Sequence, residues 1–263
     1  MIVLVGCGKM GGAMLSGWLA QGIAAHDVTV IAPRRPVTLP EGVNWHPSDH
    51  PLPATLTPSI IVLAVKPQMM PEVVPAYAGF GEAVFLSVAA GRTVSFFQSL
   101  LGTKTQVIRA MPNTPSAVGR GMTVLFAGPT VTDSAKATAT RLMAAMGAVA
   151  WLDDEHLMNA ATAVSGSGPA YVFWLVEALA AAGERHGLPA AMAQQLARHT
   201  VAGAGEMLHR LDDPAELLRR NVTSPGGTTA AALSVLMNEN SGFKPLFEAA
   251  LAAGIQRSQE LAG

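Results

Sequence analysis

The sequence predicts an α/β Rossmann-type parallel sheet domain followed by an all-α dimerisation domain. Three observations predict this class: a glycine-rich turn directly after the first apolar run, regular alternation of short apolar runs with helical segments, and a later stretch with helical signals alone. A chain of 263 residues is long enough for two ordinary domains. We place the boundary near residue 153, which divides the chain into segments 1–153 and 154–263.

The composition indicates that the chain hides apolar surface against another copy of itself. Half of its residues are hydrophobic and only 13% are charged, compared with roughly 25% in typical soluble proteins. The net charge of −1 argues against a nucleic-acid partner, which would require a basic face. The single Cys7 cannot form a disulfide within the chain, which fits a reducing compartment.

The sequence has no features typical of a membrane or secreted protein. The longest apolar run, 171–182, contains Glu177 and is shorter than the ~20 residues that a bilayer requires. The opening run MIVLVG lacks the basic stretch and the cleavage site of a secretory signal. We therefore expect a cytoplasmic protein without a membrane partner.

In the first segment, short and fully apolar runs are typical of buried parallel strands. We expect strands at 2–5, 28–31, 59–65, 83–89, 106–109, 122–126 and 148–152. Helical signals cover 10–21 and 132–146, and a glycine follows each of them. The stretch 33–58 contains seven prolines, so we expect an irregular connection there rather than a crossover helix.

The second segment reads as helix throughout. We expect helices at 156–186, 190–211, 214–221, 228–238 and 242–261. For the third of these, Asp213 is expected to cap the start, with Pro214 in the first turn and Glu216 completing a capping box. Residues 171–179 are apolar on all sides of the helix, which predicts burial all round, with a second copy of the chain as the cover.

A G-x-G-x-x-G pattern joins the first strand to the first helix. Its glycines permit a tight turn, a close approach of the backbone to a diphosphate, and close packing of helix on strand, in that order. We expect this turn to bind a dinucleotide cofactor through Gly6, Gly8, Lys9, Met10 and Gly11. The alternatives are a glycine-rich turn without a ligand and, for Lys9, a solvated surface charge.

The end of the second strand indicates which cofactor binds. Enzymes that use NAD usually have Asp or Glu there for the ribose hydroxyls, whereas this chain has Arg34 and Arg35. Two arginines can pair with a 2′-phosphate, so we infer NADP(H), with NAD(H) possible because of the unusual 33–58 stretch. The alternative is that both arginines lie on a surface loop and bind no ligand.

The stretch NVTSPGGTT interrupts the helical region with two adjacent glycines and several hydroxyls. If a helix begins near Thr228, its first N–H groups have no partner within the helix and carry the positive end of the helix dipole. Gly226 and Gly227 would let the chain turn tightly there. From the residues alone, an ordinary helix-to-helix turn and an anion-binding loop remain alternatives.

Five stretches together resemble the pyrroline-5-carboxylate reductase family, and the resemblance runs essentially end to end. They are LAVKPQ (63–68), SVAAG (87–91), RAMPNTP (109–115), SGSGPAY (165–171) and VTSPGGTT (222–229). The resemblance implies an oxidoreductase of proline biosynthesis that reduces the cyclic imine L-1-pyrroline-5-carboxylate to L-proline by hydride transfer from NAD(P)H. It also implies a homodimer at least, often a decamer, with active sites completed at the subunit interface.

The resemblance further implies roles for individual residues. The substrate carboxylate is expected on the helix N-terminus, and Thr229 is the catalytic residue that hydrogen-bonds the ring nitrogen. The substrate-binding residues are Ser224, Gly226, Gly227, Thr228 and Thr229. The remaining expected cofactor-binding residues are Ala64, Val65 and Lys66, which follow the carboxyl end of a strand, where ligands bind in open α/β sheets, and Asn113 near the nicotinamide. No metal site is expected.

Several alternatives stay open. Lys66 can equally be a solvated surface charge, Asn113 part of a proline-flanked turn, and SGSGP a site of tight packing at a subunit contact. A β-hydroxyacid dehydrogenase would need a catalytic lysine on the helical segment, where Lys244 is the single candidate. A non-catalytic nucleotide sensor would retain cofactor binding without turnover.

Overall fold

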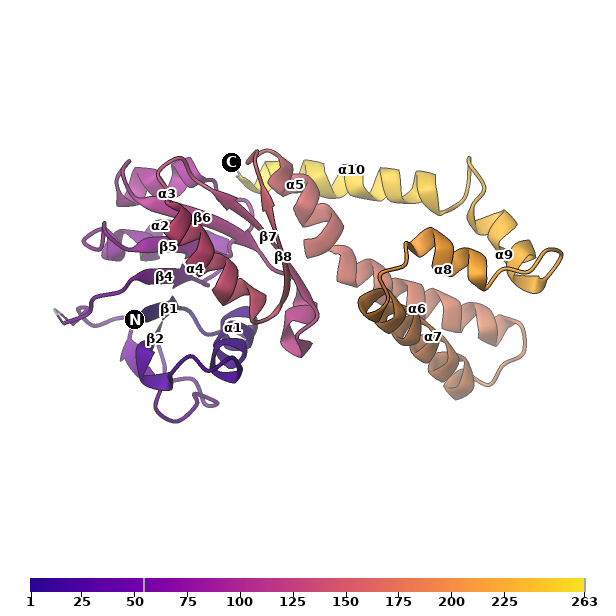
Figure 1. Ribbon diagram of the computed structural model, residues 1–263, viewed down its shortest axis with the longest axis horizontal. Helices are drawn as coiled ribbons and strands as arrows, with labels where there is room; N and C mark the ends of the chain where they lie inside the picture. The colour runs from indigo at the N-terminus through magenta and orange to yellow at the C-terminus, as the bar shows by residue number, and fades with distance from the viewer. Residues whose placement is uncertain (54, 263) are drawn as a thin grey trace. The chain divides into compact units, whose positions relative to one another are not determined.

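The computed structural model describes residues 1–53 and 55–262, which form two compact units (Figure 1). The first unit contains Met1–Ser167 together with the C-terminal residues from Ile255 on, and the second is Gly168–Gly254. The functional domain boundary expected near residue 153 stays a prediction.

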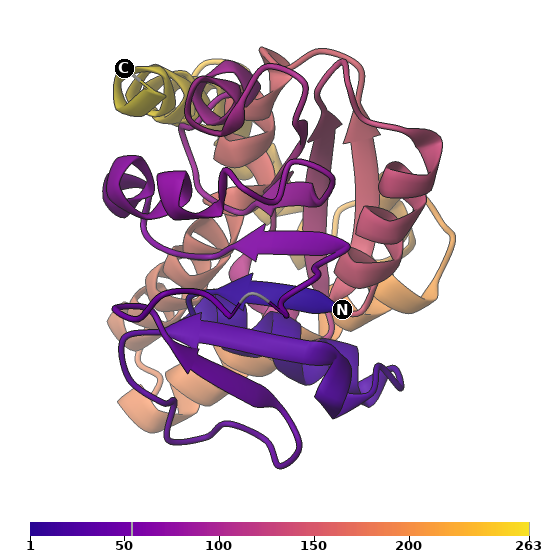
Figure 2. The same ribbon diagram turned by 90° about the vertical axis from the view of Figure 1, so that its left-hand side faces the viewer.

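The first unit is built on an eight-stranded sheet with the order β3-β2-β1-β4-β5-β6-β7-β8. Its strands are β1 (Ile2–Val5), β2 (Val28–Ala32), β3 (Asn44–Pro47), β4 (Ile60–Leu63), β5 (Val84–Ser87), β6 (Gln106–Met111), β7 (Gly121–Ala127) and β8 (Gly147–Leu152). All neighbouring pairs are parallel except β6 and β7. The sheet is strongly twisted, so β1 and β2 run in a clearly different direction from β7 and β8 (Figure 2). The predicted parallel-dominant sheet is confirmed.

The apolar strands alternate their side chains between two helical layers. One layer contains α1 (Lys9–Ala20) and α4 (Asp133–Ala144), and the other contains α2 (Met70–Val73), the short 3₁₀ turn η3 (Val74–Tyr77) and α3 (Val94–Leu101). Ile2 and Leu4 face the first layer, whereas Val3 and Val5 face the second. Because both faces are covered, the central strands are apolar throughout.

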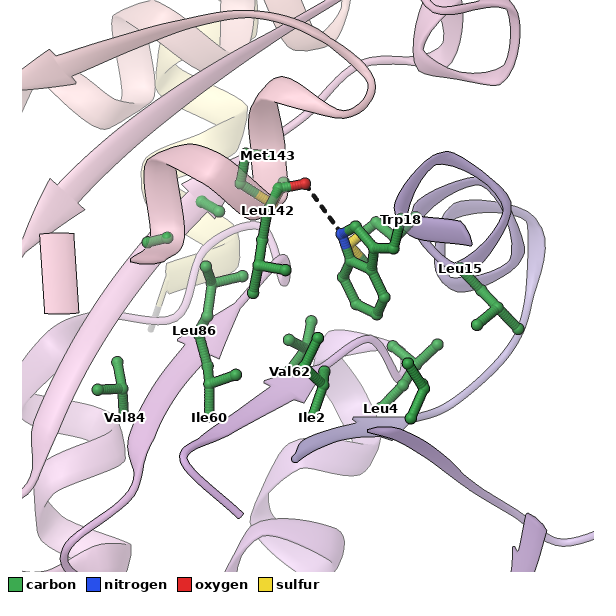
Figure 3. Close-up of a cluster of buried hydrophobic side chains, with 14 of the residues drawn as sticks. Ile2, Leu4, Leu15, Trp18, Ile60, Val62, Val84, Leu86, Leu142 and Met143 are labelled. Atoms are coloured by element: carbon green, nitrogen blue, oxygen red, sulfur yellow. Dashed lines mark hydrogen bonds between the residues drawn. The ribbon is translucent and has the colours of Figure 1, made fainter. Parts of the chain in front are cut away.

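Trp18 on α1 joins two helices of the first layer (Figure 3). Its side chain is fully buried, and its Nε1–H donates a hydrogen bond of 2.9 Å to the Leu142 carbonyl of α4. The indole thereby fills the space above β1 and β4 while its one polar atom is satisfied.

Among the elements of this unit that were not predicted are β3 and α3. The proline-rich stretch 33–58 contains no α-helix among its described residues, as expected, but it does contain β3, which pairs with β2. A strand that carries Asn44 and Pro47 is tolerated because it lies at the edge of the sheet. Helix α3 was also missed, although Thr93 caps it by accepting a hydrogen bond from the Phe96 N–H.

The remaining elements of the first unit include η1 (Ala25–Asp27), η2 (Pro67–Met69), η4 (Thr114–Val118), α5 (Leu157–Ala161) and the end of α10 (Phe243–Ala262). The continuous helix predicted at 156–186 is wrong. A π-helical turn, η5 (Thr162–Gly166), separates α5 from α6 (Gly168–Arg185), and within it the Ser167 N–H bonds to the Thr162 carbonyl. The clustered Ser-Gly-Ser-Gly-Pro residues favour this irregular turn over regular helix.

The second unit is helical, with α6, α7 (Ala190–Arg210), α8 (Ala215–Asn221), α9 (Thr228–Leu236) and the start of α10. Its buried apolar core is small and consists of Ala180, Ala193 and Ala197 with Val176 against them. The predicted capping box is wrong: Pro214 occupies the N-cap position of α8, and no side chain caps this helix. A proline N-cap leaves the first N–H groups of α8 to solvent.

The apolar stretch of α6 is exposed in the single chain. Phe173 and Trp174 are 61% and 66% accessible, and Val172, Leu175 and Leu179 are also exposed. Contiguous apolar surface of this kind is typical of an oligomer interface. Within the described residues, no helix combines the length and the apolar character needed to span a bilayer.

Candidate functional site

The glycine turn lies where the strand order reverses. β1 is flanked by β2 on one side and β4 on the other, so the turns after β1 and β4 lie side by side at one edge of the sheet. The Gly6 N–H bonds to the Ile31 carbonyl at 2.9 Å, and the Ala64 N–H bonds to the Val5 carbonyl at 2.8 Å. Ligands of open α/β sheets bind at this point of reversal, outside the carboxyl ends of the strands.

Each glycine of the turn has a separate steric reason to be glycine. Gly6 has a φ of 92°, and a Cβ there would lie 2.9 Å from both the Ala64 carbonyl oxygen and Val65 Cγ1. A Cβ on Gly11 would collide with the Gly6 carbonyl oxygen. Gly8 has open space around it and is the N-cap of α1 without a capping side chain. The first N–H groups of α1 are therefore accessible to an anion.

The other residues predicted for the cofactor surround this edge. Ala64 and Val65 are half-buried directly after β4 and contact Gly6, whereas Lys9 and Lys66 are exposed. Met10 is partly buried against the core. The neighbouring Cys7 is half-buried, and this burial raises the pKa of its thiol. A neutral, packed thiol is unreactive. The turn is therefore expected to act through its backbone N–H groups.

Arg34 and Arg35 are exposed, two and three residues beyond the end of β2. In the described residues, neither guanidinium forms an ion pair with a carboxylate. Both cations are thus available at the half of the sheet that holds the adenosine end of a dinucleotide.

Asn113 follows β6 at the same edge of the sheet. Its Nδ2–H donates to the Ser165 carbonyl at 3.0 Å, and its Oδ1 accepts the Met122 N–H at 2.9 Å. The side chain is therefore engaged with two backbone groups of the protein, one in η5 and one in β7.

The second unit contains the predicted turn before α9. The Gly227 N–H bonds to the Ser224 carbonyl at 3.0 Å, with Pro225 and Gly226 between them. Gly226 has a φ of 71°, so the turn has the proline and the positive φ typical of type II. A Cβ on Gly227 would collide with Ser224 Oγ, which explains the second glycine.

α9 begins at Thr228, as predicted, with Gly227 as an N-cap that provides no side-chain hydrogen bond. The Ala231 N–H is the first to bond back, to the Gly227 carbonyl at 3.1 Å. The N–H groups of Thr228, Thr229 and Ala230 precede it and have no acceptor within the helix. Together with the exposed Ser224, they form a group of donors suited to a carboxylate.

A partly buried ion pair near the cofactor edge was not predicted from the sequence. Arg109 on β6 is only 8% exposed and lies 2.9 Å from Glu155 Oε1, which also accepts the Val94 N–H at 2.8 Å. The pair ties β6 and the start of α3 to the segment that leads into α5. Arg109 is the first residue of the RAMPNTP motif. The motif was therefore recognised, but no role was predicted for its arginine.

Comparisons with known proteins find similar proteins over the whole chain. A family model described as pyrroline-5-carboxylate reductase dimerisation matches residues 155–261, and one described as NADP oxidoreductase, coenzyme F420-dependent, matches residues 1–91. A pyrroline-5-carboxylate reductase of Pseudomonas aeruginosa is 39% identical, covering 99% of this chain and 96% of the relative. One of Mycobacterium tuberculosis is 38% identical with the same coverage.

Two solved structures are similar over the whole chain. A pyrroline-5-carboxylate reductase of Coxiella burnetii superposes with a TM-score of 0.93 at 35% identity, covering 100% of this chain and 98% of the other. The Plasmodium falciparum pyrroline carboxylate reductase with NADP bound gives a TM-score of 0.82 at 28% identity, with the same coverage.

Proposed function

Because this chain belongs to the pyrroline-5-carboxylate reductase family and reduces L-1-pyrroline-5-carboxylate to L-proline with a nicotinamide cofactor, we propose how its residues divide that work. The glycine turn of the first unit binds the cofactor, and the N-terminus of α9 binds the substrate carboxylate. The observation that carries the second assignment is the uncapped helix start behind the turn Ser224–Gly227.

The cofactor is NADP(H) in this proposal. The diphosphate lies on the first N–H groups of α1, which Gly8 leaves open, and the backbone of Gly6, Lys9, Met10 and Gly11 surrounds it. Ala64, Val65 and Lys66 line the neighbouring strand end. Arg34 and Arg35 bind the 2′-phosphate, supported by their exposure and by the NADP in the Plasmodium relative. NAD(H) is the weaker alternative.

The substrate carboxylate accepts hydrogen bonds from the N–H groups at the start of α9 and from the Ser224 hydroxyl. The helix dipole adds about 0.3–1 kcal/mol to the binding of such an anion. Gly226 and Gly227 keep the approach free of side chains, and Thr228 contributes its N–H. Thr229, half-buried one residue later, hydrogen-bonds the ring nitrogen.

The chemistry supplied by the nicotinamide is transfer of a hydride to the carbon of the C=N bond. With the ring nitrogen protonated, that carbon is already electrophilic, so the protein chiefly has to orient the ring. Thr229 fixes the nitrogen and the amine it becomes, while the helix start fixes the carboxylate. These two anchor points fix an axis through the ring, and the ring then presents one of its faces to the nicotinamide.

The active form contains at least two copies of the chain. The family model that matches 155–261 is one of dimerisation, and the exposed apolar stretch of α6 agrees with it. A decamer is the further assembly implied by the family resemblance, and a cytoplasmic location stays a prediction from the sequence.

Steady-state kinetics test the proposal. In a mixture of purified protein, NADPH and L-1-pyrroline-5-carboxylate, the absorbance of reduced nicotinamide should fall. One proline should form for each NADPH consumed. The matched control is 1-pyrroline, the same ring without the carboxylate, for which kcat/KM should fall about tenfold or more. Equal kcat/KM for the two imines would contradict the role of α9, and absence of turnover in protein that binds NADPH would contradict the function.

A further inference from the structure

The side chain of Asn113 continues the contact of β6 with β7 beyond their last backbone pair. β6 and β7 pair in an antiparallel register that ends with Met111 opposite Val124. Two residues further along, the same register places Asn113 opposite Met122, beyond the last backbone pair of this ladder. Asn113 Oδ1 accepts the Met122 N–H at 2.9 Å and so takes over this position.

The other end of the same amide satisfies a carbonyl that the helix leaves without its regular donor. In an α-helix the Ser165 carbonyl would accept the N–H of residue 169. That residue is Pro169, which has no N–H. Asn113 Nδ2 donates to the Ser165 carbonyl instead, at 3.0 Å and across 52 residues of sequence.

A steric contact fixes the same turn. Gly166 packs so closely on β6 that a Cβ there would lie 2.8 Å from Met111 Cε. The π-helical turn η5 is thus held against the end of β6 by one backbone approach and one side-chain amide, both within the first unit. π-Helical turns are frequent at functional sites.

This end of β6 lies at the cofactor edge of the sheet. β6 runs parallel to β5, β4 and β1, so its carboxyl end shares an edge with the glycine turn after β1. A dinucleotide spans the two halves of such a sheet. With the 2′-phosphate assigned to Arg34 and Arg35 beyond β2, the nicotinamide end belongs on the half that contains β6.

We propose that Asn113 is a positioning residue for hydride transfer: its amide fixes the backbone of Ser165–Ser167 at the nicotinamide end without touching cofactor or substrate. This inference rests on the proposed function. It joins two motifs, MPN and SGSGP, because the backbone ladder ends at Met111 and Pro169 removes a donor, and a single amide compensates for both.

The variant Asn113→Asp separates the two hydrogen bonds. A carboxylate still accepts the Met122 N–H, but it has no donor for the Ser165 carbonyl and faces it with another acceptor. We expect kcat to fall about tenfold or more, since small misplacements at a reacting centre are costly. The Kd for NADPH, measured by fluorescence titration, should stay within about twofold of wild type.

Asn44→Asp is the matched control. Asn44 Nδ2 donates to the His26 carbonyl, also at 3.0 Å, but Asn44 begins β3 at the opposite end of the strands. This variant loses an equivalent hydrogen bond and should keep its kcat. A purely structural role for Asn113 would lower Tm in both variants with kcat unchanged in both, which would overturn the inference.

The binding measurement distinguishes this positioning role from direct contact of Asn113 with the nicotinamide, which makes a different prediction. Direct contact predicts that NADPH binding weakens by the same factor as kcat/KM, an outcome that would also overturn the inference while leaving the reductase activity of the wild type intact. The proposed function fails separately, if the wild type itself does not turn over.

A second comparison covers the case in which Asn113→Asp does not fold. In a Pro169→Ala background, the substituted residue regains a backbone N–H, which can donate to the Ser165 carbonyl. Asn113→Ala should therefore cost less kcat in this background than in wild type. An equal loss in the two backgrounds would contradict a role through the Ser165 carbonyl.

Discussion

At the residue scale, Thr229 is the side chain on which the proposed chemistry depends most. It is half-buried in the first turn of α9, next to the free N–H groups. We predict that Thr229→Ala lowers kcat by about five- to tenfold, the value of one hydrogen bond to the ring nitrogen, while the Kd for NADPH is unchanged.

Ser234→Ala on the same helix is the control for Thr229. Its hydroxyl donates to the Ala231 carbonyl, so its loss removes a hydroxyl from α9 away from the helix start. Rates measured under saturating NADPH should be those of wild type for Ser234→Ala. Equal rates for Thr229→Ala would remove Thr229 from the mechanism.

The arginines after β2 carry the second prediction at this scale. Because both guanidiniums are exposed and screened by solvent, we assign the pair together about 1.5–3 kcal/mol, the value of one hydrogen bond to a charged group. Replacing Arg34 and Arg35 together with alanine should therefore raise the KM for NADPH about 10- to 100-fold, with little change for NADH.

Arg141→Ala serves as the control, because Arg141 is an exposed arginine of the same unit on α4. It should leave both KM values unchanged. If the double substitution raised the KM for NADPH and NADH alike, neither arginine would contact the 2′-phosphate.

At the element scale, the turn before α9 sets the direction in which the helix presents its N–H groups. Gly226 has a φ of 71°, where a side chain costs about 1–2 kcal/mol. We predict that Gly226→Ala raises the KM for the cyclic imine, because the strained turn relaxes and moves the donors, and that NADPH binding is unaffected.

Gly187→Ala is the control that separates the effect of backbone strain from the effect of a change in the turn before α9. Gly187 has a φ of 95° in the turn between α6 and α7, and like Gly226 it has open space where a Cβ would stand. Both variants should lose similar stability in thermal unfolding. A rise in KM for both would mean that general destabilisation, and not the α9 turn, is responsible.

The contact between α1 and α4 gives a prediction about stability. Trp18→Phe removes the buried Nε1–H bond to Leu142 and leaves a small void. We expect a loss of about 1–3 kcal/mol in the free energy of unfolding, seen as a decrease in Tm of about 3–10 °C.

Gln21→Ala is the matched change at the surface. Gln21 Nε2 bonds to the Ala144 carbonyl at 3.5 Å, between the same helix pair but exposed. Loss of this hydrogen bond should change the free energy of unfolding by no more than about 0.5 kcal/mol. Equal Tm values for the two variants would show that burial of the indole does not stabilise this contact.

At the scale of the whole molecule, the exposed stretch of α6 predicts obligatory association. Trp174 is 66% accessible and lies among other exposed apolar side chains. Trp174→Glu places an unpaired charge in the proposed interface, which is costly to bury. We predict that sedimentation velocity finds a smaller oligomer than for wild type.

Val37→Glu is the comparison, since Val37 is fully exposed on the other unit, in the loop after β2. It should sediment as wild type does. A Trp174→Glu variant that also sediments as wild type would move the interface away from this part of α6.

Local chemistry made most elements predictable from the sequence. The glycine turn, the apolar strands and the start of α9 at Thr228 depend on neighbours within a few residues, and the structure has them where the sequence predicts them. The misses include β3, which is too polar to read as a strand, and η5, which breaks a region whose apolar residues resemble continuous helix. The regular helix α3 was missed as well.

The sequence by itself determined the fold class and the types of residue at each motif, because these depend on periodicity and on local backbone preferences. Its motifs also carried the family resemblance. The tertiary structure alone decided which partners those residues have. Asn113 and Ser165 are 52 residues apart, and Arg109 and Glu155 are 46 apart. Such pairs form because the sheet brings β6 and the segment before α6 together, and no pattern within either segment specifies the other.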